Sequence, residues 1–216
     1  MSKDVWGQVD DYFAQALMPT DPVFDAVLDS SRKAGLPAIN VAPNQGKLLH
    51  MMARMVGAKR ILEIGTLAAY STIWLARALG PGGSLVTLEA DAAHAAVARS
   101  NLAMAGLEGV VELREGKALD TLPSLNGPFD FVFIDADKTN NPAYFQWALT
   151  LSRPGTAIIV DNVVRDGKVL DPKAEEKVQG VRRLAEMLAT ETRVTATALQ
   201  TVGGKGWDGF ILALVN

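Results

Sequence analysis

The chain has 216 residues, of which 49% are hydrophobic and 21% are charged, and its formal net charge is −3 at pH 7. This composition fits one folded domain with a large core, or at most two small domains, and argues against a disordered chain. The acidic balance argues against a broad basic surface for nucleic acid, and the lack of cysteine excludes disulfides, thiolate metal sites and cysteine nucleophiles.

The N-terminal region predicts helices and no targeting segment. Its first residues, "MSKDVWGQVDDYF", lack the basic and apolar parts of a signal peptide, and no apolar run approaches the ~20 residues that span a bilayer. We therefore expect a cytoplasmic protein without a membrane segment. Apolar residues at helical spacing predict a helix over 4–18, and Asp21-Pro22 predicts the start of a second helix that stops near Gly35 and Pro37.

A third helix is predicted within residues 43–59, "PNQGKLLHMMARMVGAK". Its spacing gives one apolar face, which we expect to pack into the core: Leu48, Met51, Met52, Met55 and Val56. We treat residues 1–40 as an N-terminal helical extension and residues 41–216 as one domain.

From residue 60 the pattern changes to short apolar strands that alternate with helices. Strands are predicted at 60–65, 84–90, 109–115, 129–137 and 155–162, and helices at 72–80, 92–106, 142–151 and 173–190. Such alternation predicts a parallel sheet with right-handed crossovers. Residues 192–216 predict two further strands around a glycine-rich turn. The expected fold class is therefore α/β, with a doubly wound, mostly parallel seven-stranded sheet and an antiparallel C-terminal hairpin.

Four of the predicted strands end in an acidic residue. Because parallel strands share one direction, these carboxylates should lie along the same edge of the sheet, where α/β proteins bind their ligands. A lone acid there would be an ordinary strand end, but four together raise one another's pKa unless a cation compensates. This edge therefore predicts a positively charged ligand, a metal ion, or both, beside Glu63, Glu89, Asp135 and Asp161.

The loop after the first strand, "EIGTLAAYS", predicts a nucleoside ligand without a diphosphate. Gly65 permits a tight turn and Ser71 can hydrogen-bond a ligand, but the second and third glycines of the dinucleotide fingerprint are missing. Glu89, about twenty residues further on, is well placed for ribose hydroxyls. A nucleoside that carries positive charge points to S-adenosylmethionine.

At the other end of the edge, Asp135, Asp161 and Asn162 offer only oxygen ligands. "DN" alone is more often an ordinary turn, but its pairing with Asp135 on the adjoining strand favours a metal site. Such ligands suit a hard cation, Mg²⁺ first, with Ca²⁺ or Mn²⁺ as alternatives.

Taken together, these motifs resemble the class I methyltransferases, and more narrowly the cation-dependent O-methyltransferases of the catechol and caffeoyl-CoA type. The resemblance covers residues 40–216 and rests on "GAKRILEIGTLAAYSTIWLA", "LVTLEAD", "FDFVFIDADK" and "VDNVVRDGKV" in that order. It implies a Rossmann-like methyltransferase domain over 41–216, a homodimer, and a metal held by Asp135, Asp161 and Asn162. It makes Lys138 and Asp135 the catalytic pair and implies cofactor contacts from Val41, Glu63, Gly65, Thr66, Ser71, Glu89, Ala118, Asp135 and Asp137.

Two positions depart from the family pattern. Ala69 stands where glycine is usual, which could narrow the room for the methionine part of the cofactor. Val164-Arg165-Asp166 replaces a stretch that often carries an aromatic residue, which puts a flat substrate wall in doubt and suggests a polar or charged acceptor.

The chemistry implied is transfer of a methyl group to a hydroxyl of a small catechol-like molecule by a single in-line displacement. A phenol has a pKa near ~10, and a metal chelated by two vicinal oxygens favours the oxyanion. Lys138 could accept the remaining proton, or could simply pair with a neighbouring acid. The two histidines, His50 and His94, are expected to be structural.

Other functions remain open at this stage. A hydroxylated uridine in tRNA is the main alternative acceptor, because some bacterial relatives act there, although the acidic balance counts against it. A nicotinamide-dependent oxidoreductase would share the fold, but the chain lacks a Tyr-x-x-x-Lys pair. The "GGKG" at 203–206 lacks the context of a phosphate-binding loop.

Overall fold

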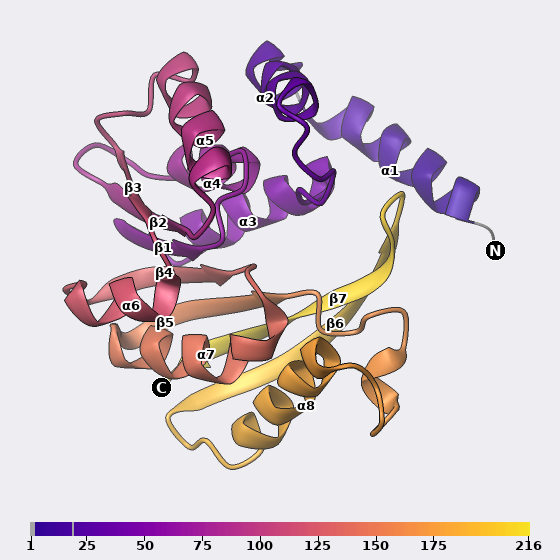
Figure 1. Ribbon diagram of the computed structural model, residues 1–216, viewed down its shortest axis with the longest axis vertical. Coiled ribbons are helices and arrows are strands. Elements are labelled where there is room, and N and C mark those ends of the chain that lie inside the picture. Colours follow the sequence, from indigo (N-terminus) through magenta and orange to yellow (C-terminus); the bar gives the residue numbers. More distant parts are fainter. Residues whose placement is uncertain (1–2, 19) are drawn as a thin grey trace.

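The computed structural model describes residues 3–18 and 20–216 (Figure 1). The helices are α1 Lys3–Leu17, α2 Pro22–Lys33, α3 Pro43–Met55, α4 Tyr70–Ala76, α5 Ala92–Met104, α6 Ala118–Thr121, α7 Asn141–Thr150 and α8 Glu176–Leu188. Single 3-10 turns are η1 Leu122–Ser124, η2 Lys138–Asn140 and η3 Lys168–Leu170. The strands are β1 Arg60–Ile64, β2 Ser84–Glu89, β3 Val111–Glu115, β4 Phe129–Ile134, β5 Ser152–Asp161, β6 Val194–Gly203 and β7 Gly206–Val215.

The strands form one seven-stranded sheet in the order β3-β2-β1-β4-β5-β7-β6. Strands β1 to β5 pair in parallel, and β7 joins β5 and β6 antiparallel, so the predicted fold class and the C-terminal hairpin are confirmed. The chain order reverses between β1 and β4, and a crevice at such a switch point is where doubly wound sheets bind their ligands.

Helices cover both faces of the sheet, with α3, α4 and α5 on one side and α6, α7 and α8 on the other (Figure 1). The central position of β4 in the sheet explains why its sequence is almost wholly apolar. Phe131 and Phe133 join the core below α4 and α5, whereas Val132 and Ile134 join the core around α7 and α8. A strand buried on both faces needs hydrophobic residues at successive positions.

Helix α2 is tied to the main core. Asp21 accepts a hydrogen bond from the Val23 amide at 3.0 Å and Pro22 opens the helix, as predicted. Phe24 stacks on Trp74 of α4 at 4.2 Å between ring centroids. The division of the chain at residue 40 stays a prediction. Within the described residues, no helix is long and apolar enough to cross a membrane.

The predicted core face of α3 is wrong. Met51 and Met55 are 49% and 81% exposed, and the residues that α3 buries are Gly46, Leu49 and Ala53. The reason is close packing on α4: a Cβ at Gly46 would overlap the Trp74 indole, so small residues rather than methionines make the contact. The hydrophobic periodicity predicted the helix correctly, but it assigned the buried face to residues that neighbour the true one.

Candidate active site

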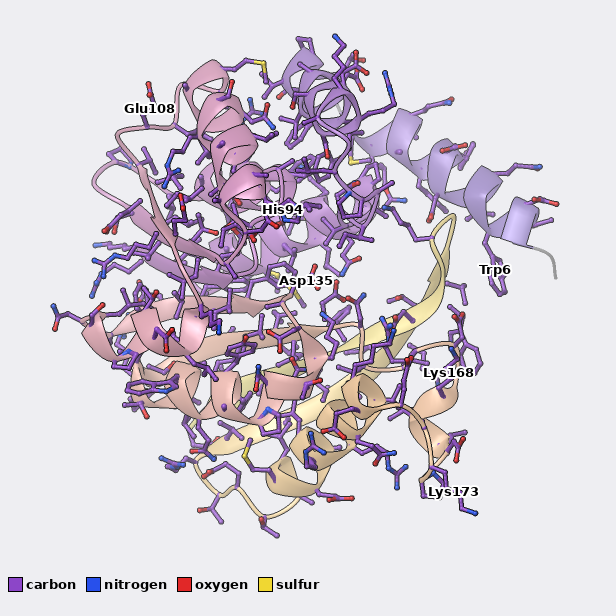
Figure 2. All side chains as sticks on the ribbon, in the orientation of Figure 1. Trp6, His94, Glu108, Asp135, Lys168 and Lys173 are labelled. Carbon is purple, nitrogen blue, oxygen red and sulfur yellow. The ribbon has the colours of Figure 1, made fainter. Side chains whose placement is uncertain are left out.

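The carboxyl ends of the parallel strands bring together most of the predicted site residues. Glu89 ends β2, Asp161 ends β5, and Asp135 directly follows β4. Figure 2 shows Asp135 near the middle of the molecule with His94 above it. Two cavities open at this edge, one of about 570 Å³ and one of about 530 Å³.

Glu63 differs from the other three acids. Its side chain is completely buried, and Glu63 is not among the described residues that line the two cavities. It accepts hydrogen bonds from the hydroxyls of Ser71 at 2.6 Å and Thr87 at 2.7 Å, and a third from Thr72. Burial raises its pKa to about 7 in spite of these donors. Glu63 therefore orders the base of the site by holding three hydroxyls.

Glu89 organises the loop that follows β1. Its Oε2 accepts hydrogen bonds from the backbone amides of Thr66 at 3.1 Å and Leu67 at 2.8 Å, and its Oε1 accepts one from Asp91 at 2.9 Å. A carboxylate has about four acceptor positions, so it can also receive ligand hydroxyls. His94 lies 3.6 Å from Glu89 and lines the same cavity, which the sequence pattern did not predict.

Backbone geometry lets this loop approach β4 closely. Gly65 has φ +101°, and a Cβ there would collide with the carbonyl of Asp135. Ala69 has φ +66° and caps α4 in the left-handed conformation that usually favours glycine. Ala69 is buried and is not among the described residues that line the two cavities, so its effect on the room for the cofactor stays a prediction.

The 570 Å³ cavity collects the predicted cofactor residues other than Glu63. Its lining includes Val41, Gly65, Thr66, Ser71, Glu89, Ala118, Asp135 and Asp137. Tyr144 of α7 also lines it and was not predicted. Its hydroxyl donates a hydrogen bond to Asp137, whose other oxygen accepts one from Asn140 at 2.7 Å. Burial and the charge of Asp137 raise the pKa of Tyr144, so the phenol remains a donor that fixes Asp137.

Asp135 and Lys138 form a close pair at the junction of the two cavities. Lys138 lies on η2, is 8% exposed, and its Nζ donates to Asp135 Oδ1 at 2.7 Å. Asp161 is 3% exposed, and burial followed by the charge of Asp135 raises its pKa to about 7. Lys138 and hydrogen bonds from the Asn162 amide and the Gln45 side chain oppose this rise. Gln45 comes from α3 and has no local sequence signal.

The residues at this junction fit a hard divalent cation. Asp135, Asp161 and the left-handed Asn162 (φ +58°) supply two carboxylates and one amide oxygen, and a cation would relieve the repulsion that raises the pKa of Asp161. Groups of three or more His, Cys, Asp or Glu side chains placed to hold a metal do not occur in the described part of the chain. A metal here would therefore use the Asn162 amide as its third protein ligand.

The 530 Å³ cavity adjoins the larger one and shares Asn162 with it. Val41 and Asn162 line both cavities, and Asp161 lines only this one. Arg165 and Asp166 line it, as the sequence suggested for a polar acceptor. This cavity does have an aromatic side chain in its wall, but from another element. Trp207 of β7 lines the cavity and lies 3.0 Å from the Cβ position of Gly167.

This combination of fold and site defines a class. A doubly wound sheet with an antiparallel hairpin, and a nucleoside-sized cavity at the switch point without a diphosphate fingerprint, is typical of class I methyltransferases.

Comparison with known proteins agrees with this class. The family model described as O-methyltransferase matches residues 20–214. The chain is 54% identical to a catechol O-methyltransferase of Niastella koreensis over 100% of both chains. It is 52% identical to a catechol O-methyltransferase of Mycobacterium tuberculosis over 96% of this chain and 95% of the relative. An O-methyltransferase from Bacillus cereus, solved in complex with SAH, matches with a TM-score of 0.98 and 55% identity over 100% of both chains.

The chain therefore belongs to the O-methyltransferase family, and it is an S-adenosylmethionine-dependent O-methyltransferase. This confirms the resemblance seen in the sequence and overturns the nicotinamide-dependent alternative.

Proposed function

We propose that this enzyme transfers a methyl group to one of two vicinal hydroxyls of a catechol-like small molecule, with a divalent cation at Asp135, Asp161 and Asn162. The observation that carries the proposal is the meeting of the two cavities at this set. Asn162 lines both cavities, Asp135 lines the larger and Asp161 the smaller. The relatives named catechol O-methyltransferase, at 52% and 54% identity, support the choice of acceptor.

The methyl donor occupies the 570 Å³ cavity in this proposal. Glu89 binds the ribose hydroxyls while it holds the backbone of Thr66 and Leu67. Ser71 directs its own proton to Glu63, so its oxygen lone pairs face the cavity and can accept from the donor's ammonium group. Val41, Gly65, Ala118 and Asp137 complete the contacts, and Glu63 acts through Ser71. The donor supplies an electrophilic methyl group on a sulfonium.

The acceptor occupies the 530 Å³ cavity. A divalent cation, Mg²⁺ first and Ca²⁺ or Mn²⁺ as alternatives, supplies Lewis acidity that favours the phenolate form of a bound hydroxyl. Asp135, Asp161 and Asn162 would hold the cation, so that the acceptor hydroxyl bound to it faces the donor cavity. The acceptor oxygen would attack the methyl carbon in line, so that an O–CH3 bond forms as the CH3–S bond breaks and S-adenosylhomocysteine leaves as a neutral thioether, with no covalent intermediate on the chain.

Lys138 is the candidate proton acceptor. It is nearly buried, and its Nζ lies beside the Asp135 carboxylate at the junction of the two cavities. A neutral Lys138 removes the proton of the acceptor hydroxyl, and the resulting ammonium remains stabilised by Asp135 at 2.7 Å. Lys138 thus moves a proton at Nζ while Asp135 holds it in place.

Exposed apolar residues support a homodimer. Helix α1 exposes Val5, Val9, Tyr12, Phe13 and Leu17, and α3 exposes Met51 and Met55. Apolar patches of this kind on adjacent helices mark interaction surfaces. A second copy of the chain would cover them. Light scattering at several concentrations tests this, with a monomer at all of them as the contrary result. A cytoplasmic location stays a prediction.

The alternative acceptor, a hydroxylated uridine of tRNA, has one observation in its favour: Arg165, Lys168 and Lys205 line the smaller cavity. Asp10, Asp166 and Asp208 line it as well, so these cations do not make a basic surface that could follow a phosphate backbone.

An acceptor panel tests the proposed function. Purified enzyme with Mg²⁺ and methyl-labelled S-adenosylmethionine is given simple catechols, caffeoyl esters and undermodified tRNA. We expect label in the catechols and none in RNA. Label in tRNA alone would replace the proposal by the nucleoside alternative.

A further inference from the structure

The "GGKG" sequence at 203–206 forms the tip of the β6–β7 hairpin, and Gly203, Lys205 and Gly206 line the acceptor cavity. Gly203 pairs with Gly206, which leaves Gly204 and Lys205 as a two-residue turn. Helix α1 packs directly on this tip. Asp10 accepts a hydrogen bond from the Gly204 amide at 2.9 Å, and a Cβ at Gly203 would overlap the Asp10 carboxylate. The glycines therefore let α1 fix the tip and present Lys205.

The Lys205 side chain turns toward the acceptor cavity and the segment before α3. Its Nζ donates to the carbonyl of Ala38 at 3.1 Å, and both residues line the cavity. An ammonium has three donors, so this contact leaves two of them for a ligand. Partial burial lowers the pKa of Lys205, and the charge of Asp135 opposes this effect, so the ammonium lies within electrostatic reach of the catalytic pair.

Lys205 differs from the other cations of this cavity. Arg165 pairs with Asp208, whose Oδ1 also accepts from the amides of Val164 and Arg165. Lys168 lies on turn η3, toward the edge of the molecule in Figure 2. In residues 3–18 and 20–216, no carboxylate lies within the 4.0 Å ion-pair distance of Lys205 Nζ. Its charge therefore remains available to an anion.

The acids nearest the tip are already engaged. Asp10 accepts from Gly204 and from the Asn44 side chain at 3.2 Å, which holds α1 against α3. The flat side of the cavity is fixed too, because the Trp207 indole donates to Gln200 at 2.9 Å. A planar ring can thus lie along Trp207 with its hydroxyls toward Asp161 and Asn162 and a substituent toward Lys205.

We propose that Lys205 is a specificity-determining residue that selects acceptors carrying a carboxylate on the catechol ring, over neutral and cationic catechols. This inference rests on the proposed function and names the substrate class of the same site. The ammonium and the carboxylate form a charge-assisted hydrogen bond, which is stronger than a hydrogen bond between neutral groups. A cationic side chain at the same place would meet Lys205 with like charge.

The test compares two acceptors that differ only in this charge, 3,4-dihydroxybenzoate and its methyl ester, with dopamine as the cationic probe. Three variants are assayed beside the wild type. Lys205→Gln removes the charge but can still donate to Ala38, and Lys205→Arg keeps the charge. Lys173→Gln makes the same charge change on an exposed loop away from both cavities.

We expect the ratio of kcat/KM for the carboxylate to kcat/KM for the ester to fall about 10- to 100-fold in Lys205→Gln, because a charge-assisted hydrogen bond is lost. The ratio should stay within about 3-fold of wild type in Lys205→Arg and in Lys173→Gln. Dopamine turnover should rise in Lys205→Gln. A calorimetric Kd for 3,4-dihydroxybenzoate, measured with S-adenosylhomocysteine and Mg²⁺ present, should weaken in parallel.

Two results would overturn the inference and leave the proposed function standing. One is an unchanged ratio in Lys205→Gln. The other is an equal loss for carboxylate and ester, which would show that Lys205 only latches the hairpin to Ala38. If the wild type methylates none of the three catechols, the proposed function itself is wrong and the inference fails with it.

Discussion

The two halves of the site are built in opposite ways. In the cofactor half, the carboxylates of Glu63 and Glu89 are satisfied by hydroxyls and amides from the neighbouring loop. In the acceptor half, Asp161 is buried beside the like charge of Asp135, which contributes to the rise in its pKa. Acids that the protein's own donors satisfy hold the fold together, whereas a buried acid beside a like charge marks where a cationic ligand would be bound.

The largest effect that separates the halves is expected from Asp161→Asn. This change removes a proposed metal ligand charge, so methyl transfer to a catechol should fall by about 10³-fold. Its Tm should be unchanged or higher, because a buried carboxylate next to Asp135 is replaced by a neutral amide. Turnover and thermal melts of the same preparation measure both.

The matched control is Asp171→Asn, an exposed acid in the loop before α8, which should leave turnover and Tm near wild type. If the Tm of Asp161→Asn fell strongly as well as its activity, Asp161 would stabilise the fold instead of serving the acceptor half.

Lys138→Met should lower kcat by about 10²-fold, because proton removal from the acceptor is lost. The affinity for S-adenosylmethionine should stay near wild type. Lys138→Arg separates the two roles of the residue: a guanidinium can pair with Asp135 but does not release its proton near neutral pH. If Lys138→Arg retains wild-type kcat across pH 6 to 9, pairing alone explains Lys138.

In the cofactor half, Glu89→Gln should weaken S-adenosylmethionine binding by about 10-fold, because the amide replaces one acceptor oxygen with a donor. Calorimetry measures this directly. Glu115→Gln is the matched control, since Glu115 is the partner of Glu89 in the adjoining strand but pairs with Arg99 instead. Equal affinity of the Glu89→Gln and Glu115→Gln variants for S-adenosylmethionine would show that Glu89 does not bind the cofactor.

The smallest expected effect on activity belongs to Glu63→Gln, which should instead change how stability depends on pH. The folded pKa of about 7 lies above the ordinary 4.5, so between these values the folded state binds the proton more tightly than the unfolded state. Wild-type stability should therefore decrease as pH rises from 4.5 to 7, by on the order of 3 kcal/mol.

Glu63→Gln should remove the part of that decrease that Glu63 contributes and leave the part due to Asp161, whose pKa is also raised to about 7, as measured by urea unfolding at pH 5 and pH 7.5. Glu112→Gln, at an exposed carboxylate on β3, should retain it. Identical pH profiles for wild type and Glu63→Gln would show that Glu63 does not titrate in this range.

The same contrast explains what could be predicted from the sequence. The cofactor half follows from contiguous strand–loop–helix segments, so Gly65, Ser71 and Glu89 carry local signals that survive without coordinates. The strands, their mostly parallel direction and the C-terminal hairpin follow from alternation and turn residues in the same way. The pattern did not reveal that Glu63 faces inward, because strand alternation carries no information in a strand buried on both faces.

The acceptor half could be predicted only in part. Asp135 and Asp161 end strands, but Gln45, Trp207 and Lys205 reach the site from α3 and the hairpin, where no local pattern marks them. The α3 methionines show the same limit: the contact with Trp74 is set by the small residues Gly46 and Ala53, and hydrophobic periodicity gives most weight to large side chains.

Removal of divalent cations tests the central claim most directly. Enzyme dialysed against a chelator should bind S-adenosylmethionine by calorimetry with near wild-type affinity, because the cofactor half is complete by itself. It should transfer no methyl group to 3,4-dihydroxybenzoate until Mg²⁺ is returned, and Asp161→Asn should not recover. Full transfer by the chelated wild-type enzyme would contradict the proposed role of Asp135, Asp161 and Asn162.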